Sequence, residues 1–386
     1  MIKDIAVLSP LYVTIFWSIV LLSDQSKSKP KFLLGIFMFV AFFLYLTHAF
    51  FFNENYLAYF HAESVYLLTS LSVYPLYYCY IKLLTIESSF KFRNLIHFIP
   101  AIVLGLASFV SGLFVTDQQQ LDYIEKFVIQ RDISRLELLS PAGIKGIIFI
   151  FCRIIFVFQV TFYLLKGAIL TQQHDKRIAN FYSNTEGKSL LWVRLLTISF
   201  LVTSMMSITF SIIGRNFFLL NEFLLLIPSF IFSSLLYLIG YLGNITIQVI
   251  VEPHHNQPRP NSSRVHTSQF MKEKILHLFK NDKIFRNPDL LITNLSDSLQ
   301  TPTVEVSQLI NDEFKTDFSD FVNQYRISIA KELIAKNLNN GITLEAIAAE
   351  SGFGSLNAFI RVFKLYEGTT PEKYKEVSRQ RKFPLN

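Results

Sequence analysis

Cysteine is nearly absent from this sequence. The chain has 386 residues but only two cysteines, Cys79 and Cys152, and neither lies at a metal-ligand spacing from another Cys or His. Disulfide frameworks and structural zinc sites need more of these residues than the chain supplies. His254 and His255 are adjacent but have no second ligand pair. We therefore expect no disulfide, no metal site, no cofactor and no catalytic centre.

Charged residues are also scarce. They make up 17% of the chain, whereas hydrophobic residues make up 51% and phenylalanine alone occurs 39 times. Almost all of the apolar excess lies before about residue 250, and charged residues return after it. This composition excludes an ordinary soluble two-domain protein. We expect an apolar domain over residues 1–250, a linker over 251–266 and a globular domain over 267–386.

The apolar domain consists of hydrophobic runs of about 18 to 25 residues. A helix rising about 1.5 Å per residue needs this length to cross a hydrocarbon layer about 30 Å thick. The first run is long and no small-x-small cleavage site follows it, so we interpret it as a retained span rather than a signal peptide. The sequence thus predicts a bundle of about seven transmembrane helices near residues 5–22, 32–52, 62–84, 95–115, 144–165, 190–213 and 217–242.

The distribution of Lys and Arg predicts the orientation of these spans. With the N-terminus outside, the inner loops carry most of the basic residues, whereas the outer turn at 53–63 has none. The longer outer loop, 116–143, does contain Lys and Arg, but acidic residues accompany them. Seven spans in this orientation place the C-terminal domain in the cytosol. We expect a multi-pass protein of a bacterial cytoplasmic membrane.

Three charged residues in or near the spans are candidate functional groups. Arg153 lies in the middle of the run IIFIFCRIIFVF, where an unpaired cation is costly. Glu63 and Glu222, toward the outer ends of their spans, are the candidate partners. Two interpretations stay open, a ligand pocket built around Arg153 for an anionic group and a buried structural ion pair.

Residues 251–268, VEPHHNQPRPNSSRVHTS, are rich in Pro, Asn and Ser and have no apolar period. This composition is typical of a semi-extended tether. A rigid helix that continues from the last span into the C-terminal domain is therefore not expected.

The C-terminal domain has the pattern of two helix-turn-helix motifs. In the second motif, Thr343 and Ser355 are predicted helix caps, and Gly352 supplies a turn residue with positive φ. Small residues such as Ala348 let the supporting helix approach the recognition helix closely. The exposed face of that second helix carries Asn357 and Arg361 and is sized for the major groove, about 12 Å wide. In the first motif, Asp317 is the predicted cap of a following long helix.

Residues 347–374, IAAESGFGSLNAFIRVFKLYEGTTPEKY, resemble the C-terminal signature of AraC/XylS-family transcription regulators. The resemblance extends over roughly residues 267–377. The matching residues are Ile347, Ala348, Gly352, Phe353, Ser355, Phe359, Arg361, Phe363, Lys364, Gly368, Thr370, Pro371 and Tyr374, and upstream Ser307, Phe318, Phe321, Arg326 and Ala330.

The resemblance implies an all-α domain with two recognition helices set in successive major grooves of double-stranded DNA. In the second helix it places Leu356, Asn357, Ala358 and Ile360 on base edges, and Ser355, Arg361 and Lys364 on phosphates or flanking bases. In the first helix the implied base-edge residues are Thr303, Val304, Glu305, Gln308 and Asn311.

The first recognition helix departs from the basic pattern of the family. Glu305, Asp312 and Glu313 are acidic, and Lys315 stands where the family usually has Gly. From Thr267 onward the chain has 16 Lys and Arg against 15 Asp and Glu, so the domain is almost neutral. Either the carboxylate of Glu305 accepts a hydrogen bond from a cytosine amino group, or this helix binds weakly. We favour weak binding, with membrane tethering or a homodimer raising the effective concentration.

The sequence as a whole predicts a one-component regulator in which an unknown small-molecule or membrane signal acts on the bundle and changes DNA occupancy. Two alternatives remain open: a transporter or membrane enzyme with a DNA-binding appendage, and an inert membrane anchor for a DNA-binding domain. The spans show neither repeat symmetry nor a reactive constellation, which disfavours the first alternative.

Overall fold

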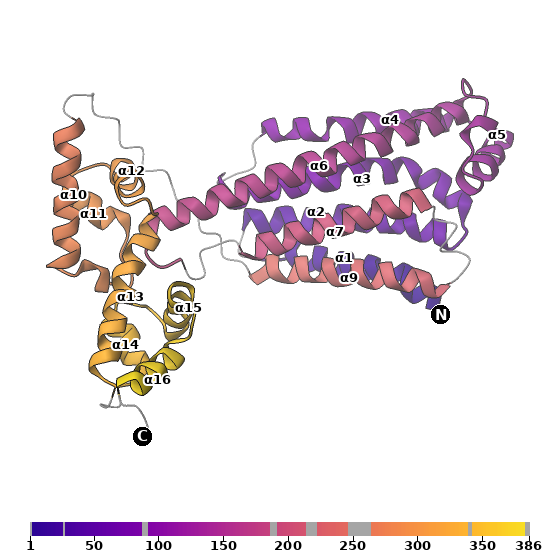
Figure 1. Ribbon diagram of the computed structural model, residues 1–386. Helices are drawn as coiled ribbons and strands as arrows, with labels where there is room; N and C mark the ends of the chain where they lie inside the picture. The colour runs from indigo at the N-terminus through magenta and orange to yellow at the C-terminus, as the bar shows by residue number, and fades with distance from the viewer. Residues whose placement is uncertain are drawn as a thin grey trace. The chain divides into compact units, whose positions relative to one another are not determined.

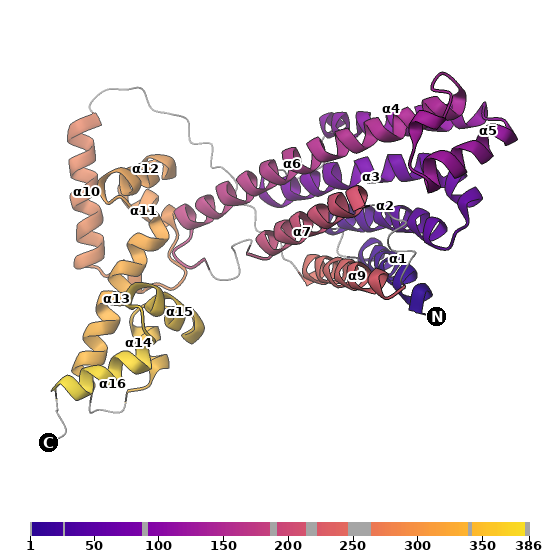
Figure 2. The same cartoon turned by 45° about the vertical axis from the view of Figure 1, so that its right-hand side comes forward.

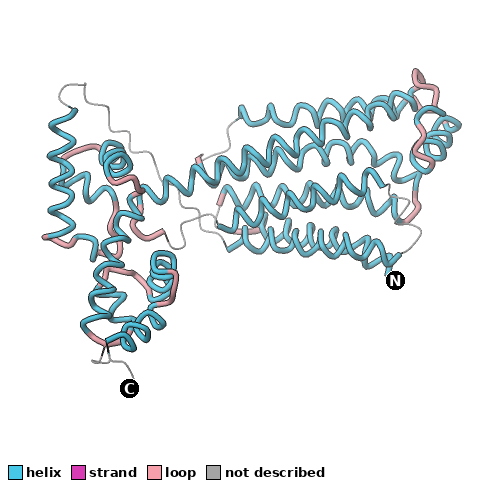
Figure 3. Tube along the Cα trace, in the orientation of Figure 1, coloured by secondary structure: helices cyan, strands magenta, loops and turns pink. Residues whose placement is uncertain are grey.

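The computed structural model describes residues 2–25, 28–86, 92–185, 191–213, 222–245, 264–338 and 342–382. Over these residues the fold is helical, and the only sheet-like pairing among them is an isolated bridge between Tyr182 and Leu291 (Figures 1 and 3). The predicted all-α class is confirmed. The chain forms two compact units, Met1–Gln172 with Leu190–Ile250 and Gln173–Ser189 with Val251–Asn386.

The first unit is a bundle of long helices. Figures 1 and 2 show these helices lying along one another. Their largest shared core is formed where Trp17, Phe37, Tyr77, Tyr80 and Phe200 pack together. The long helices described are α1 (Ile2–Leu22), α2 (Lys29–Phe52), α3 (Tyr56–Thr85), α4 (Ile99–Leu113), α6 (Pro141–Phe181), α7 (Leu191–Ile213) and α9 (Glu222–Ile245).

Short helical turns connect α3, α4 and α6. A 3-10 turn, η1 (Phe92–Phe98), precedes α4. Between α4 and α6 lie α5 (Asp117–Asp122), a π-helical turn η2 (Tyr123–Ile129) and η3 (Ile133–Arg135). Tyr123 of η2 is fully buried in a small core with Phe60 of α3 and Leu136. This core fixes the α4–α6 connection to α3.

Five of the described helical stretches are long and apolar enough to cross a membrane: Lys3–Leu22, Lys29–Phe52, Phe92–Leu113, Pro141–Phe181 and Phe223–Ile245. The expected spans at 62–84 and 190–213 fall on α3 and α7, which are not among these five. In α7 the apolar stretch Val193–Thr209 is shorter. Helix α3 has 30 residues, of which 21 are buried, and these include Glu63, several Ser and Thr, and many Tyr. Because its neighbours surround it, α3 has no need of an apolar surface.

The second unit contains two small helical cores joined by one long helix. Around Phe279 and Phe321 pack α10 (Arg264–Lys280), η4 (Ile284–Arg286), α11 (Ile292–Leu299) and α12 (Thr303–Glu313). Around Phe359 and Phe363 pack α14 (Leu344–Glu350), α15 (Leu356–Glu367) and α16 (Pro371–Lys382). Helix α13 (Phe318–Lys336) contributes Phe321 to the first core and Ala330 and Ile334 to the second.

The boundary between the units falls inside α6, because residues 173–189 belong to the second unit. The composition predicts an apolar domain over all of 1–250 and does not indicate that this segment belongs to the second unit. Most of the expected linker, up to residue 263, lies outside the described residues, and its last three residues begin α10.

Candidate functional site

The second helix-turn-helix motif consists of α14, a tight turn and α15. Thr343 and Ser355 cap the two helices, since their side chains accept hydrogen bonds from the backbone N–H of Ala346 at 3.2 Å and of Ala358 at 3.0 Å. Gly352 in the turn has φ of +89°. The predicted caps and the predicted positive φ are confirmed.

Helix α15 presents a polar face to solvent. Asn357, Arg361 and Lys364 are exposed and occur at intervals of four and three residues, which places them on one side of the helix. Ser355, Leu356 and Ile360 are half-buried at the edges of this face. Leu365 adjoins the face and is 76% exposed, although the sequence analysis did not single it out.

Ala358 does not belong to the exposed face. Its side chain is 3% exposed and packs in the core with Phe359 and Phe363. The position follows from the helical period, because Ala358 lies on the same face of α15 as the buried Phe359, Val362 and Phe363. The placement of Ala358 on a base edge was wrong.

Helix α12 presents the corresponding face of the first motif. Val304, Glu305 and Gln308 are exposed, whereas Thr303 and Asn311 are half-buried. Pro302 precedes the helix and supplies no side-chain cap. The side chains named for this helix in the sequence analysis therefore share one accessible edge.

The acidic residues at the end of α12 are partly neutralised. Lys272 of α10 donates a hydrogen bond to the carboxylate of Glu313 at 2.8 Å, and this bond holds the pKa of Glu313 below its usual range. Lys315, which stands where the family has Gly, has φ of +56°. Lys315 therefore adopts the left-handed backbone conformation that Gly would favour, and its side chain adds strain there.

Arg326 of α13 connects the two motifs. It is 1% exposed, and its Nε and one terminal nitrogen donate to the carbonyl oxygens of Phe285 at 2.8 Å and Asn287 at 2.7 Å. Its guanidinium lies 5.7 Å from the ring centre of Phe353 in the second turn. Burial lowers the pKa of Arg326 to about 10, so the side chain is still a cation at neutral pH. Arg326 is one of the residues that match the AraC/XylS pattern. In the structure it contacts Phe285 and Asn287 beside the first motif and Phe353 in the second.

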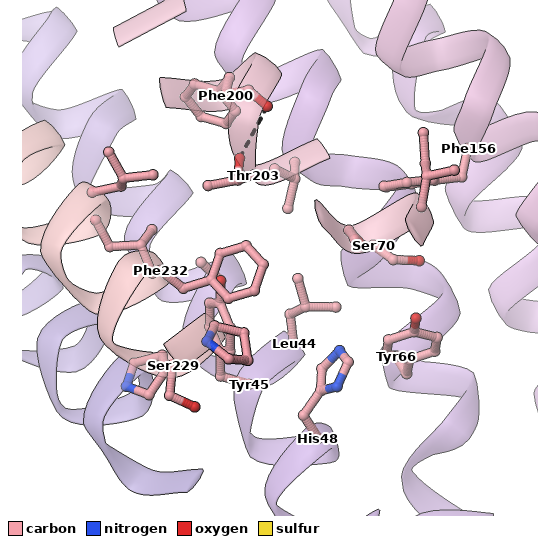
Figure 4. Close-up of a pocket in the computed structure, with 18 of the residues that line it drawn as sticks. Leu44, Tyr45, His48, Tyr66, Ser70, Phe156, Phe200, Thr203, Ser229 and Phe232 are labelled. Carbon is pink, nitrogen blue, oxygen red and sulfur yellow. Dashed lines mark hydrogen bonds between the residues drawn. The ribbon is translucent and has the colours of Figure 1, made fainter. Parts of the chain in front are cut away.

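The first unit contains a cavity of about 430 Å³ between α1, α2, α3, α6, α7 and α9. Figure 4 shows His48 near Tyr45 and Tyr66, with Phe232 and Ser229 of α9 on one side and Phe156 of α6 on the other. The wall is mostly apolar. Its polar lining residues are Tyr45, His48, Tyr66, Ser70, Tyr74, Cys152, Arg153, Thr203, Ser207 and Ser229.

Arg153 lines this cavity. Its Nε is buried and has no hydrogen-bond partner in the part of the chain that the structure describes. The guanidinium lies 4.9 Å from the ring centre of Phe149, whose ring stacks on Tyr66 at 6.1 Å. Tyr66 in turn meets His48 edge-on at 5.4 Å. Arg153, Tyr66 and His48 therefore lie along one part of the cavity wall.

Glu63 has a different partner from the one expected. Its carboxylate lies 3.3 Å from Nζ of Lys145 and accepts hydrogen bonds from the hydroxyl of Tyr123 at 2.8 and 2.9 Å. Lys145 also donates to Ser108 of α4 at 3.1 Å. The proposed pairing of Glu63 with Arg153 was wrong, because Lys145, on α6 two turns before Arg153, reaches the carboxylate first. The side chain of Glu222 lies outside the described residues.

Comparison with known proteins identifies the second unit. A family described as "Helix-turn-helix domain" matches residues 295–376. The HTH-type transcriptional regulator GadX of Escherichia coli (strain K12) is 33% identical over 86 residues, which are 22% of this chain and 30% of GadX. The chain therefore spans less than a third of the length of this relative. Residues 295–376 form a helix-turn-helix domain of the AraC type.

Two solved structures each resemble 28% of this chain. One is a protein of unknown function from Listeria innocua, 27% identical, with 28% of this chain and 95% of that chain covered and a TM-score of 0.25. The other is the C-terminal domain of the two-component response regulator yesN from Fusobacterium nucleatum. It is 24% identical, with 28% and 98% covered and a TM-score of 0.24.

Proposed function

We propose that this chain is a membrane-embedded transcription regulator that binds double-stranded DNA through α12 and α15 and senses a signal through its helix bundle. The helix-turn-helix domain at residues 295–376 is the observation that carries the DNA-binding part of the proposal. Exposed Asn357 and Arg361 on α15 have the chemistry for base edges and phosphates, since Arg binds guanine and Asn binds adenine with paired hydrogen bonds.

The surface of α4 supports the membrane part of the proposal. This helix buries Ala101, Gly105, Ser108 and Ser111 and turns its large apolar side chains outward. Leu106 and Leu113, for example, are 57% and 66% exposed. In water this pattern would be inverted, but in a bilayer small residues pack between helices and large apolar residues face lipid. The inside location of the C-terminal domain stays a prediction from the distribution of positive charge.

Substitutions on α15 test the DNA-binding part. We expect Arg361→Ala and Asn357→Ala each to weaken binding by about tenfold to a hundredfold, because a good paired contact to a base is worth about 1–3 kcal/mol. The measurement is the affinity of the full-length chain, in detergent, for a duplex that the wild-type chain selects from a random library. Lys336→Ala serves as the control, since Lys336 is an exposed cation of α13 outside both recognition helices. Unchanged binding by both α15 variants would remove this helix from the mechanism.

The cavity supports the sensing part. Its volume of about 430 Å³ lies within the range of about 300–1,000 Å³ that small-molecule sites occupy. The apolar wall suits a hydrophobic body, and the buried Nε of Arg153 has, among the described residues, no acceptor of the kind that a buried guanidinium needs. The ligand class that satisfies both is an amphipathic anion, an apolar chain that ends in a carboxylate or a phosphate.

Binding of simple amphiphiles tests this assignment. We expect decanoate or decyl phosphate to bind the full-length chain, and Arg153→Gln to weaken that binding by roughly tenfold to a hundredfold, since hydrogen bonds to charged groups are worth about 1.5–3 kcal/mol. The two anions distinguish a carboxylate site from a phosphate site, and decanol reports the apolar contribution alone. Calorimetry in nanodiscs gives the affinities. Lys166→Gln is the control, because Lys166 lies on the same helix beside Phe162 and does not line the cavity.

The same measurements separate the alternatives. If Arg153→Gln binds the anions as tightly as the wild type, the cavity does not recognise charge, and the inert-anchor hypothesis gains support. Net movement of the anion across a vesicle membrane that holds the purified chain would instead favour a transporter with a DNA-binding appendage.

A further inference from the structure

Residues 181–185, the last residue of α6 and the four that follow it, pack into the helix-turn-helix unit. Ser183 is 1% exposed, and each of its polar groups has a partner. Its N–H donates to the carbonyl of Leu290 at 3.1 Å, its carbonyl accepts from the hydroxyl of Ser319 at 3.2 Å, and its hydroxyl accepts from Arg326 at 3.1 Å. Phe181, two residues earlier, packs on the core around Phe279. The segment is thus held by side chains, backbone and apolar contact together.

The Ser183 hydroxyl completes the set of acceptors around Arg326. The other two acceptors are the carbonyls of Phe285 and Asn287, which belong to and follow η4 beside the first motif. The guanidinium lies over Phe353 of the second motif. A buried guanidinium needs acceptors for its N–H groups, so losing the Ser183 hydroxyl would leave a donor unsatisfied. The segment therefore supports the residue that links the two motifs.

The segment also reaches the start of the second recognition helix. Asn184 and Thr185 line a small hollow together with Gly354, Ala358 and Arg361. A Cβ on Gly354 would lie 3.4 Å from Nδ2 of Asn184. This is an ordinary contact distance, and it places Asn184 directly beside the turn before α15.

We infer that the surface between the two helix-turn-helix motifs is a docking site for residues 181–185 of this chain, and that docking fixes the relative position of α12 and α15. Helix α6 is one helix from Pro141 to Phe181; it carries Arg153, and the docked segment begins at its last residue. A change at the cavity can therefore reach the DNA-binding motifs through α6, without the Pro-, Asn- and Ser-rich stretch of 251–263 having to transmit it. The docking itself is independent of the proposed function, but its effect on DNA binding rests on that function.

Distance measurements on the full-length chain test the docking directly. Spin labels at Val304→Cys in α12 and Leu365→Cys in α15 sit on exposed positions, while the native Cys79 and Cys152 are 0% and 2% exposed and stay unlabelled. We expect a narrow distance distribution with Ser183 in place. Ser183→Lys should broaden or shift it, because a lysine does not fit a fully buried site beside Arg326 and repels that cation. Ser183→Ala removes only the hydroxyl and should give an intermediate result.

The affinity for selected duplex DNA supplies the functional readout. We expect Ser183→Lys to weaken binding at least tenfold, since two motifs that are no longer held together lose the benefit of a fixed spacing. Ser298→Lys, at an exposed serine of α11, should change neither readout. A distance distribution that neither Ser183 variant alters would overturn the docking site. An altered distribution with unchanged DNA affinity would overturn its regulatory role. If the wild-type chain selects no DNA, the proposed function fails, while the distances still report whether the segment docks.

Discussion

Replacing Arg326 with methionine is expected to destabilise the helix-turn-helix unit by about 3 kcal/mol and to abolish measurable DNA binding. The substitution keeps the bulk of the side chain and removes three donated hydrogen bonds, to Phe285, Asn287 and Ser183. Each buried acceptor left without a donor costs about 1–3 kcal/mol, and relief from burying a cation offsets part of that sum. The net loss falls on a contact that joins both motifs.

Hydrogen exchange of the amides of α13 in the full-length chain measures this loss as a free energy of local opening. Lys331→Met, five residues along the same helix, is the matched control. Lys331 is a cation whose ammonium donates to Glu367 at 2.9 Å with 38% of its side chain exposed. Exposed pairs of this kind contribute about 0–1 kcal/mol. Equal protection of α13 in the two variants would mean that the buried contacts of Arg326 do not hold the motifs.

The helix-turn-helix motif could be predicted from sequence because its determinants are local. A cap such as Thr343 or Ser355 bonds to a backbone group three residues ahead, and Gly352 acts through its own φ. The prediction failed at Ala358, which was placed on a base edge although the helical period puts it on the buried face with Phe359 and Phe363. Helix identity was predictable, and the face of each residue was less so.

The bundle was harder to predict because its polar contacts join residues far apart in sequence. Glu63 and Lys145 are separated by 82 positions, and nothing in either neighbourhood indicates that α3 and α6 bring them together. Hydrophobicity found most of the bundle helices and placed a span on α3, but it did not show that the Tyr, Ser and Thr side chains of this helix are buried among its neighbours. The sequence shows how apolar a helix is, but only the packed structure shows whether its side chains contact other helices.

The docked segment gave no sequence signal at all. Ser183 and Asn184 are short polar residues after a long helix, a composition typical of any loop. Their role comes from the backbone of Leu290 and the side chains of Ser319 and Arg326, all of which lie more than 100 residues later in the chain. Such an element becomes visible only when the fold is known.

Replacing Gly352 with alanine is expected to destabilise the same unit by more than about 3 kcal/mol. The residue has φ of +89°, where an L side chain adds about 1–2 kcal/mol of strain. A Cβ would also lie 2.4 Å from the carbonyl O of Phe285 and 2.6 Å from Cα of Arg286. Since both are backbone atoms, relief requires the second motif to move away from the residues that Arg326 holds.

Gly368→Ala separates the two contributions. Gly368 ends α15 with φ of +69°, and apart from its chain neighbours no atom of the described residues lies within 4 Å of a Cβ built there. Its substitution should therefore show the strain alone, about 1–2 kcal/mol. Hydrogen exchange of α14 and α15 in the full-length chain gives both values, and their difference measures the close approach of the second motif to η4. Equal losses at the two glycines would show that this approach is not tight, and the fixed spacing of the recognition helices would then have to come from α13, Arg326 and the docked segment.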